Sequence, residues 1–147
     1  MATTNVQIAE GPDTNSIAVY NTSTTTDIPA YRAVIIDASN ILDNALTKNQ
    51  IAVTLPTDTT NPSVIVGFTR TIIPALGTGR MIPTGPVTLA VCKGAVTGGT
   101  VVDNSVTASY TGMVATHAAG KNQCGIALAT GADGDTIPVL LAVAVNA

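Results

Sequence analysis

The chain has a single histidine, His117, and histidine is the side chain most often used for acid–base catalysis. A serine hydrolase would need an acid and a serine around it, and Asp103 and Ser105 lie nearby in the sequence. However, no G-x-S-x-G motif is present to expose a nucleophilic serine. A histidine in an alternating pattern such as VATHA is more typical of a surface or an interface. We therefore predict no catalytic residue and no enzymatic activity.

Metal and cofactor sites find equally little support. One histidine and two distant cysteines do not have the spacing of zinc ligands. Asp133 and Asp135 flank a glycine in ADGDT, and such paired carboxylates are compatible with calcium, but the bidentate glutamate of an EF-hand is absent. An Asp-Gly pair is more typical of a turn. The glycine runs GTG and TGG lack the context of a phosphate-binding loop, so we predict no metal ion and no cofactor.

Cys92 and Cys124 are the only cysteines. The first residues, MATTNVQIAEG, have no basic segment followed by an apolar one, so we expect no signal peptide and synthesis in the cytoplasm. In that compartment the two cysteines are expected to be reduced and buried as small hydrophobic side chains. A disulfide between them is the alternative.

The composition indicates a protein that packs against neighbours. Aromatic residues make up only 3% of the chain, so the core must consist of Val, Ile, Leu and Ala. Charged residues make up 10%, against roughly 25% in an average soluble domain, so Thr, Asn, Ser and Gly must cover much of the surface. Such a surface does little to oppose association. The alternative interpretation is a Thr-rich soluble β-domain.

The charge distribution argues against nucleic acid and membrane partners. The formal net charge is −3, and the six basic residues are spread along the chain without forming a cluster. A groove that tracks phosphates would need such a cluster. The longest apolar run, IPVLLAVAV, is too short to span a bilayer.

Short runs of Ile, Val and Thr separated by Gly and Pro predict an all-β fold. Nine candidate strands can be identified, at residues 16–21, 31–37, 50–55, 63–72, 86–94, 100–103, 113–118, 124–130 and 136–145. The segment from Asp37 to Gln50 is the exception, because Ser39 or Asn40 could cap a short helix there. At 147 residues the chain fits one domain or two very small ones.

The phrase GRMIPTGPVTLAV in the first half is echoed by GDTIPVLLAV near the end. The landmarks match in order, which predicts a duplicated four-strand unit with copies at about residues 30–92 and 98–145. The matched landmarks are Asp37 with Asp103, Gly67 with Gly125, and Ile82-Pro83 with Ile137-Pro138. Chance similarity in a biased composition is the alternative.

Two such units would share a core in a small barrel or a two-sheet sandwich with pseudo-two-fold symmetry. Both a single barrel and two packed sub-sheets are compatible with this pattern. Pro83 and Pro138 should lie at strand starts or edges, because proline cannot donate a ladder hydrogen bond. Gly67 and Gly125, each inside a strand pattern, predict bulges or bends. These expectations place residues 30–147 in a single β-domain.

Residues 1–29 precede the repeats and form an extended N-terminal arm together with the first strand. The stretch TNVQIA alternates polar and apolar residues, so it could add as an edge strand to another subunit or pair within its own sheet. The residues that we propose for partner contact in this arm are Thr3, Thr4, Asn5, Val6, Gln7 and Ile8.

Arginines are few, and Arg is enriched in interface cores. Arg32, Arg70 and Arg80 are therefore candidate interface anchors. The alternative for each of them is a solvated surface charge.

The run GPVTLAVCKGAVTGGTVVD and the later run CGIALATGADGDTIPVLL resemble small bacteriophage head-decoration proteins, also called capsid cement proteins. The similarity lies in a G-x-x-V turn and strand, a G-x-A-L strand, a Gly-Asp turn and a final I-x-V-x-L strand. Here these motifs are Gly99 to Val102, Gly125 to Leu128, Gly134-Asp135 and Ile137 to Leu141. The segment 37–50 and the N-terminal part depart from the pattern.

The resemblance implies a structural virion protein without an active site. Such a protein would bind the major capsid protein on the outer surface of the shell, as a trimer or sometimes a dimer, and link neighbouring capsomers. A subunit of a phage tail or of another self-assembling filament is the alternative function. A carbohydrate-binding module or an enzyme is a third, although few aromatic side chains are available to stack on sugars.

Overall fold

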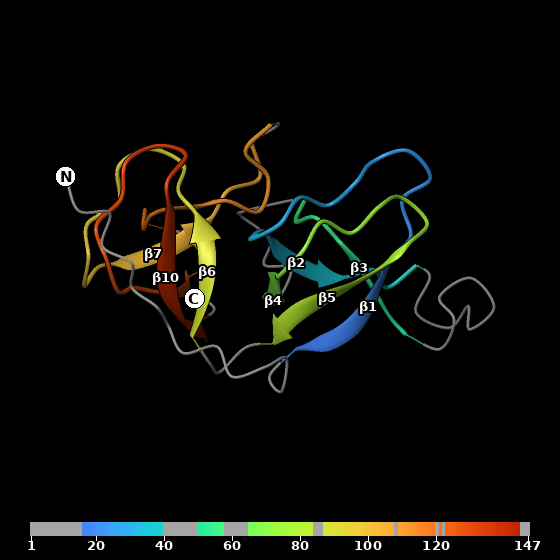
Figure 1. Cartoon of the computed structure of the whole chain (residues 1–147). Coiled ribbons are helices and arrows are strands. Elements are labelled where there is room, and N and C mark those ends of the chain that lie inside the picture. The colour runs from blue at the N-terminus through green and yellow to red at the C-terminus, as the bar shows by residue number, and fades with distance from the viewer. Residues whose placement is uncertain are drawn as a thin grey trace.

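The structure is a computed structural model that describes residues 16–39, 50–57, 65–83, 87–107, 109–119, 121 and 123–144. Within these ranges the chain forms ten β-strands and no helix, which confirms the all-β prediction. The strands form two groups of five that lie side by side (Figure 1). We call residues 16–83 lobe 1 and residues 87–144 lobe 2. No helix among the described residues is long and apolar enough to cross a membrane.

Lobe 1 is a closed five-stranded barrel in which the strand order is β1-β3-β2-β4-β5. Its strands are β1 (Ile17–Asn21), β2 (Ala33–Ile36), β3 (Ile51–Thr54), β4 (Ile65–Thr69) and β5 (Thr78–Pro83). β1 closes the barrel because it pairs with β5 in antiparallel fashion and with β3 in parallel fashion. The remaining neighbours are antiparallel.

Lobe 2 is a five-stranded sheet in which the strand order is β6-β10-β9-β7-β8, all antiparallel. Its strands are β6 (Val87–Val91), β7 (Val101–Asn104), β8 (Val114–Thr116), β9 (Gln123–Ala127) and β10 (Thr136–Ala144). A single parallel bridge between Cys92 and Val114 links its two edges, next to a hydrogen bond from Lys93 N to Val114 O of 2.7 Å. Lobe 2 is therefore closed by one bridge where lobe 1 has a parallel strand pair.

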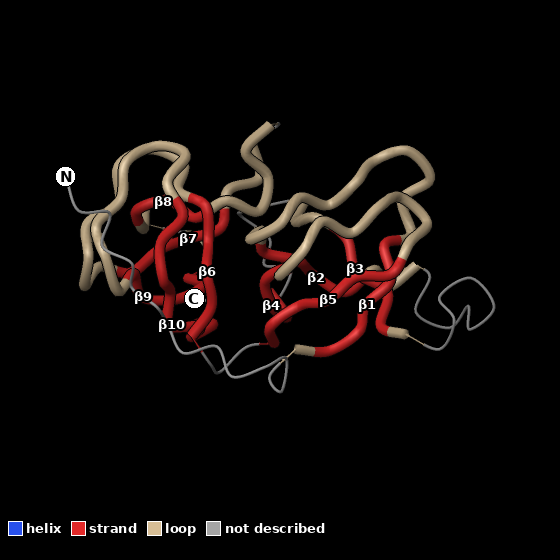
Figure 2. Tube along the Cα trace, viewed as in Figure 1, coloured by secondary structure: helices blue, strands red, loops and turns tan. Residues whose placement is uncertain are grey.

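The two lobes share one topology. If β1 to β5 are matched with β6 to β10 in chain order, every neighbour in lobe 1 has its counterpart in lobe 2. The long loops correspond as well, since Ile28 bridges Ile73 in lobe 1 as Val96 bridges Gly131 in lobe 2. These loops lie on the same side of both lobes (Figure 2). The lobes are two copies of one structural unit.

The repeated unit has five strands, not the four that the sequence predicted. β6 starts the second unit, so VTLAV is the counterpart of β1 and the sheet neighbour of VLLAV in β10. Strand pairing confirms the match of Gly67 with Gly125. It places Ile82 opposite Phe68 and Leu140 opposite Ile126, so Ile82 corresponds to Leu140 and not to Ile137. The Ile-Pro pairs at residues 82–83 and 137–138 therefore do not occupy equivalent positions in the two lobes.

Two further expectations were wrong. β5 was not among the predicted strands, because GTG was interpreted as turn material and Thr78 and Gly79 are in fact its first residues. Pro138 lies inside β10, a central strand, rather than at a strand start or edge. A proline is tolerated there because Pro138 faces the end of β9, which stops at Ala127, where no ladder acceptor requires an N–H from residue 138. Its carbonyl still accepts a hydrogen bond from Leu128 N at 2.9 Å, just beyond the end of β9. The predicted short helix lies mostly in residues 40–49, outside the described residues.

The buried side chains form two clusters. One fills the barrel of lobe 1 and comprises Val19, Ile28, Val34, Val53, Ile73 and Met81. The other fills lobe 2 and also contains four residues of lobe 1, namely Ala33, Ile35, Ile65 and Phe68. A face of β2 and β4 therefore packs into the interior of lobe 2, and the two lobes share this second core.

Gly67 and Gly125 lie beside register shifts, as predicted for glycines inside strands. A Cβ at Gly67 would lie 2.3 Å from Ile82 O, and a Cβ at Gly125 would lie 2.5 Å from Leu140 O. The neighbouring strand is thus too close for any side chain at either position.

We predict that Gly67→Ala and Gly125→Ala each lower the free energy of unfolding by about 1–3 kcal/mol, because the crowding atom is backbone and cannot rotate away. Urea denaturation of the purified variants measures the loss. Thr136→Ala, at an exposed position on β10, is the control and should change stability by less than about 0.5 kcal/mol. Wild-type stability of both glycine variants would contradict the close packing.

Backbone strain differs between the lobes at two corresponding turns. Tyr31 and Leu76 have positive φ angles of 60° and 51° in lobe 1. Their counterparts in lobe 2 are Gly99 and Gly134, with φ angles of 84° and 83°. Only glycine adopts this region without steric cost.

We predict opposite effects of reciprocal substitutions at the second turn. Leu76→Gly should raise the free energy of unfolding, and Gly134→Ala should lower it, each by about 1 kcal/mol. Both positions are exposed, and a Cβ at Gly134 has no neighbour within 4 Å, so conformation and not packing decides the sign. Thermal unfolding measures both changes; a loss of stability in Leu76→Gly would contradict the strain argument.

Candidate functional site

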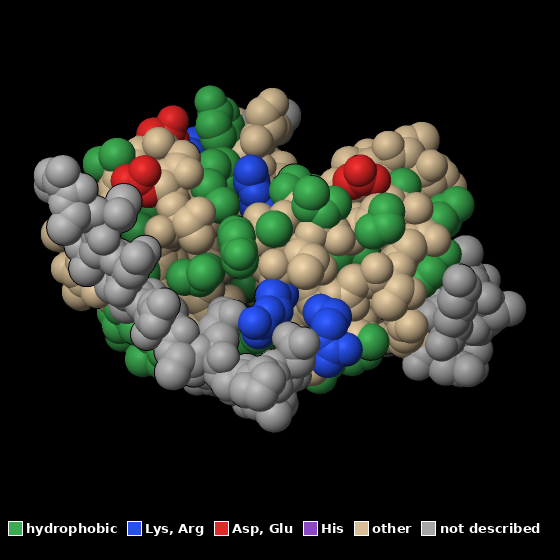
Figure 3. Space-filling view, in the orientation of Figure 1, with side chains coloured by type: hydrophobic (Ala, Val, Ile, Leu, Met, Phe, Trp, Pro, Cys, Tyr) green, Lys and Arg blue, Asp and Glu red, His purple; other side chains and the backbone are tan. Residues whose placement is uncertain are grey.

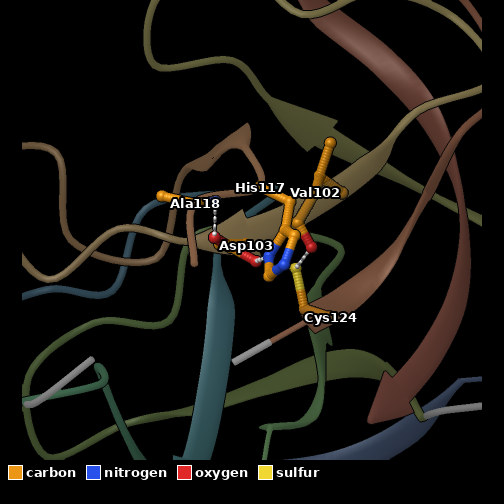
Figure 4. Close-up of polar contacts among 5 residues, drawn as sticks. All are labelled: Val102, Asp103, His117, Ala118 and Cys124. Carbon is orange, nitrogen blue, oxygen red and sulfur yellow. Dashed lines mark hydrogen bonds and ion pairs between the residues drawn. The ribbon is translucent and has the colours of Figure 1, made fainter. Parts of the chain in front are cut away.

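Asp103 and His117, the residues closest to a catalytic pattern, do form a pair (Figure 4). Asp103 is the third residue of β7 and is almost fully buried, while His117 follows β8 directly. His117 Nδ1 lies 2.6 Å from Asp103 Oδ1, and Ala118 N donates to Asp103 Oδ2 over 2.8 Å. Both carboxylate oxygens thus hold the chain that leaves β8 against β7. This arrangement fastens the β7–β8 edge of lobe 2.

The cysteines are free and buried, as predicted. Cys124 Sγ points to Val102 O at 3.4 Å, close to the Asp103–His117 pair (Figure 4). Burial, together with the Asp103 charge, raises the pKa of the Cys124 thiol far above its ordinary value. Burial, and then the charges of Asp135 and Asp133, raise the pKa of Cys92 to about 11. Both groups are neutral thiols at physiological pH and poor nucleophiles.

The carboxylates of the acidic turn of lobe 2 accept hydrogen bonds from backbone N–H groups, one in another loop and one in the turn itself. Asp133 Oδ1 accepts a hydrogen bond from Gly94 N at 2.7 Å, and Asp135 Oδ2 accepts one from Ala132 N at 2.8 Å. In lobe 1 the corresponding pair of loops is linked by Asp27 Oδ1, which accepts from Ala75 N at 2.9 Å. Among the described residues, no three His, Cys, Asp or Glu side chains gather to hold a metal ion. The carboxylates serve to fasten loops.

Residues that the structure describes line two of the surface grooves. The larger, of about 410 Å³, runs between the lobes and is lined in the described part of the chain by uncharged residues, among them Asn21, Ile28, Leu55 and Thr111. The smaller, of about 240 Å³, lies beside the Asp103 carboxylate. Lys93 in its wall donates to Thr107 Oγ1 at 3.0 Å and lies over the Tyr110 ring.

Arg32 lies at the junction of the lobes. Its Nη1 donates to Thr111 O at 3.4 Å, and its Nε is buried with no hydrogen-bond partner in the described part of the chain. Burial lowers the pKa of its guanidinium below the ordinary value. The adjacent Ala33 N donates to Gly112 O at 2.8 Å. Arg32 therefore contributes to the contact between the two lobes of its own chain.

The other two candidate arginines, Arg70 and Arg80, belong to lobe 1. Arg80 on β5 binds Ser16 twice, with Nε to Oγ and Nη2 to the carbonyl O, both at 2.7 Å. Arg70 follows β4, and its N donates to Arg80 O at 2.9 Å. Arg32 O accepts a hydrogen bond from Thr69 N at 2.9 Å, so the backbones of the three arginines lie next to one another, at β4 and its two neighbours β2 and β5. Basic side chains do lie near the junction of the lobes on the face seen in Figure 3. Residues Thr3 to Ile8 lie outside the described residues.

The sequence analysis missed an apolar band across lobe 2. Strand pairing aligns Val87 of β6, Leu140 of β10, Ile126 of β9 and Val101 of β7 in one row across four neighbouring strands. Leu140 and Ile126 are exposed, and Val87 and Val101 are half-buried. The sequence signal that could have predicted this band lies in VTLAV and CGIALAT. In both segments the residues on the outer face are as apolar as those on the inner face.

No protein-family model matches the sequence, and no curated protein matches it. Among solved structures, the chain is similar to the head fiber gp8.5 N base of bacteriophage phi29, with a TM-score of 0.61. The similarity covers 86% of this chain and 92% of that chain, at 8% sequence identity. At so low an identity it shows a shared fold.

A double-mutant cycle tests whether Asp103 and His117 together hold the chain that leaves β8 against β7. We call this pair of contacts the Asp103 clamp. Asp103→Ala leaves the Ala118 N–H and the His117 ring without their acceptor, so we expect a loss of about 1–3 kcal/mol in the free energy of unfolding. We expect Asp103→Ala and His117→Ala to be coupled by at least about 0.5 kcal/mol in urea denaturation. Asp103→Asn, which keeps one acceptor oxygen, is the control and should lose less. Strictly additive losses would show that the pair does not act as a clamp.

Proposed function

We propose that this chain is a structural protein of a bacteriophage virion that binds the outer surface of the capsid and stabilises it by linking neighbouring capsomers. The observation that carries the proposal is the fold similarity to a phage head fiber base, which extends over nearly all of both chains. The resemblance of its glycine-centred motifs to head-decoration proteins supports the same assignment. It is a role in assembly and not in catalysis.

The physical character of the molecule suits such a role. Both lobes have cores of aliphatic residues, with Phe68 as the sole phenylalanine, and carboxylates that fasten the loops. Charged residues are only 10% of the chain, so a partner surface can approach with little electrostatic or desolvation cost. A surface with few charges is suited to bridging two copies of a larger protein.

Attachment stabilises a shell through linkage. A protein that binds the assembled shell, and not its separated subunits, shifts the equilibrium toward assembly. Simultaneous contacts with two capsomers add avidity, because the second contact forms at a high effective concentration. The partners we propose are the major capsid protein and further copies of this chain, as a trimer or a dimer. The contact residues we propose are Thr3 to Ile8, with Arg32, Arg70 and Arg80.

The location of the chain can be determined on the virus particles made by the genome that encodes it. We expect gold-labelled antibodies against the purified chain to decorate the heads of these particles in electron micrographs. Particles from a genome with the gene deleted are the control and should carry no label. Label confined to tails would favour the alternative of a tail subunit, and absence from the particles would contradict both.

Deletion of residues 1–10 tests the proposed arm. Because both lobes lie C-terminal to the deletion, we expect an unchanged thermal unfolding midpoint and weaker binding to heads that lack the chain, measured by co-sedimentation. Ile72→Ala, at an exposed loop position of lobe 1, is the control and should bind like wild type. Unchanged affinity of the truncated chain would show that the arm makes no contact with the shell.

A further inference from the structure

Two arginines lie side by side on the outer surface of lobe 1. The antiparallel pairing of β4 with β5 ends with Thr69 opposite Met81. One position further, Arg70 N donates to Arg80 O at 2.9 Å, so the two arginines lie directly opposite each other. Residues in this relation project to the same face of a sheet. That face is the outer one, because Gly79 and Met81, the neighbours of Arg80 in β5, are buried in the barrel.

This pair forms a binding surface for a carboxylate. Like charges that lie directly opposite in a sheet repel each other, and an anion bound to both guanidinium groups offsets the repulsion. A carboxylate suits the planar donor geometry of arginine. The acids of the loops have other contacts, because Asp27 and Asp133 accept hydrogen bonds from loop backbones and Asp103 contacts His117.

The chain enters lobe 1 beside the arginine pair, because β1 lies next to β5 (Figure 1). Arg80 holds Ser16, the residue before β1, with hydrogen bonds from Nε to Oγ and from Nη2 to the carbonyl O, both at 2.7 Å. Both acceptors are uncharged, so this contact positions Ser16 without neutralising the guanidinium. Ala18, opposite Arg80 on β1, is small and exposed, so the surface beside Arg80 is open.

The sequence before Ser16 carries the complementary charge. Residues 1–15, which lie outside the described residues, contain Glu10 and Asp13 and no Lys or Arg. Three extended residues span at most about 11 Å, so Asp13 is within reach of the arginine pair from Ser16. Gly11-Pro12 separates the two acids, and such a pair favours a turn that can bring the chain back over β5.

We propose that Glu10 and Asp13 bind the Arg70–Arg80 pair of their own chain. This contact, which we call the arm clasp, fixes the base of the N-terminal arm against β5. Residues 1–9 extend at most about 30 Å beyond it, so the surface that the arm contacts lies around the arginine pair. Arg70 and Arg80 then serve attachment through the arm. The inference concerns the free chain and does not rest on capsid attachment, so its failure would leave the proposed function standing.

The order of the backbone at the base of the arm tests the clasp. NMR relaxation of the ¹⁵N-labelled chain gives an order parameter for each amide. In the wild-type chain we expect about 0.85 at Asp13 and Thr14, as in a rigid strand, and a fall below about 0.6 in Arg70→Gln. Arg70→Lys keeps the charge and should keep most of the order. Added salt at 1 M should lower the order of the wild-type arm, because it screens exposed charges.

A second variant tests the clasp from the arm itself. Glu10→Gln combined with Asp13→Asn should lower the order parameters as far as Arg70→Gln does, and adding Arg70→Gln to it should lower them no further. This variant also serves if Arg70→Gln fails to fold, which thermal unfolding checks. Lys93→Gln is the matched control, because it removes one positive charge from lobe 2, where Lys93 lies over Tyr110, and should leave the arm unchanged.

Three results would overturn the proposal. Order parameters below about 0.6 at Asp13 in the wild-type chain would mean that the base of the arm is not held. An equal loss of order in Lys93→Gln would reduce the effect to net charge. Wild-type order of the arm in Arg70→Gln, together with weaker co-sedimentation of this variant with heads, would assign the arginine pair to an acidic group of the shell.

Discussion

The structure depends on how the interior of lobe 2 is filled. A five-stranded sheet encloses its core only if its edge strands meet, and in lobe 2 they meet at the single bridge between Cys92 and Val114. The outer face of lobe 1, which includes Phe68, completes that core. Burying one large side chain in this position contributes about 1.5–3 kcal/mol, and losing it would leave a cavity bordered by both lobes. The two units are therefore joined by a shared core as well as by the continuous chain.

The all-β class, the buried cysteines and the bulges at Gly67 and Gly125 could be predicted from the sequence because each depends on a local property. The boundary between the two repeats could not be predicted from the sequence. VTLAV resembles VLLAV because both strands need small aliphatic residues on a buried face, and this similarity arises equally between sheet neighbours and between true counterparts. Only the pairing register, which is a tertiary property, separates the two cases.

The pairing of Asp103 with His117 shows a further limit of sequence reasoning. Their proximity in sequence matched part of a catalytic pattern, and they do meet in space. Their chemistry is decided by what else the carboxylate contacts: Asp103 also accepts from the backbone of Ala118, so it organises a strand edge. The apolar band was missed for the opposite reason. Its residues lie on different strands, and each of them alone is an ordinary exposed aliphatic side chain.

The register shared by the two lobes shows that equivalent faces are covered differently in the two lobes. Equivalent backbones present equivalent faces, yet Phe68 is covered and Ile126 is not, so the difference lies in what each lobe has next to it. A pseudo-two-fold arrangement, which the duplication suggested from sequence, would have joined like faces and left equivalent surfaces equally covered. The observed contact instead joins the outer face of β2 and β4 of lobe 1 to the interior of lobe 2.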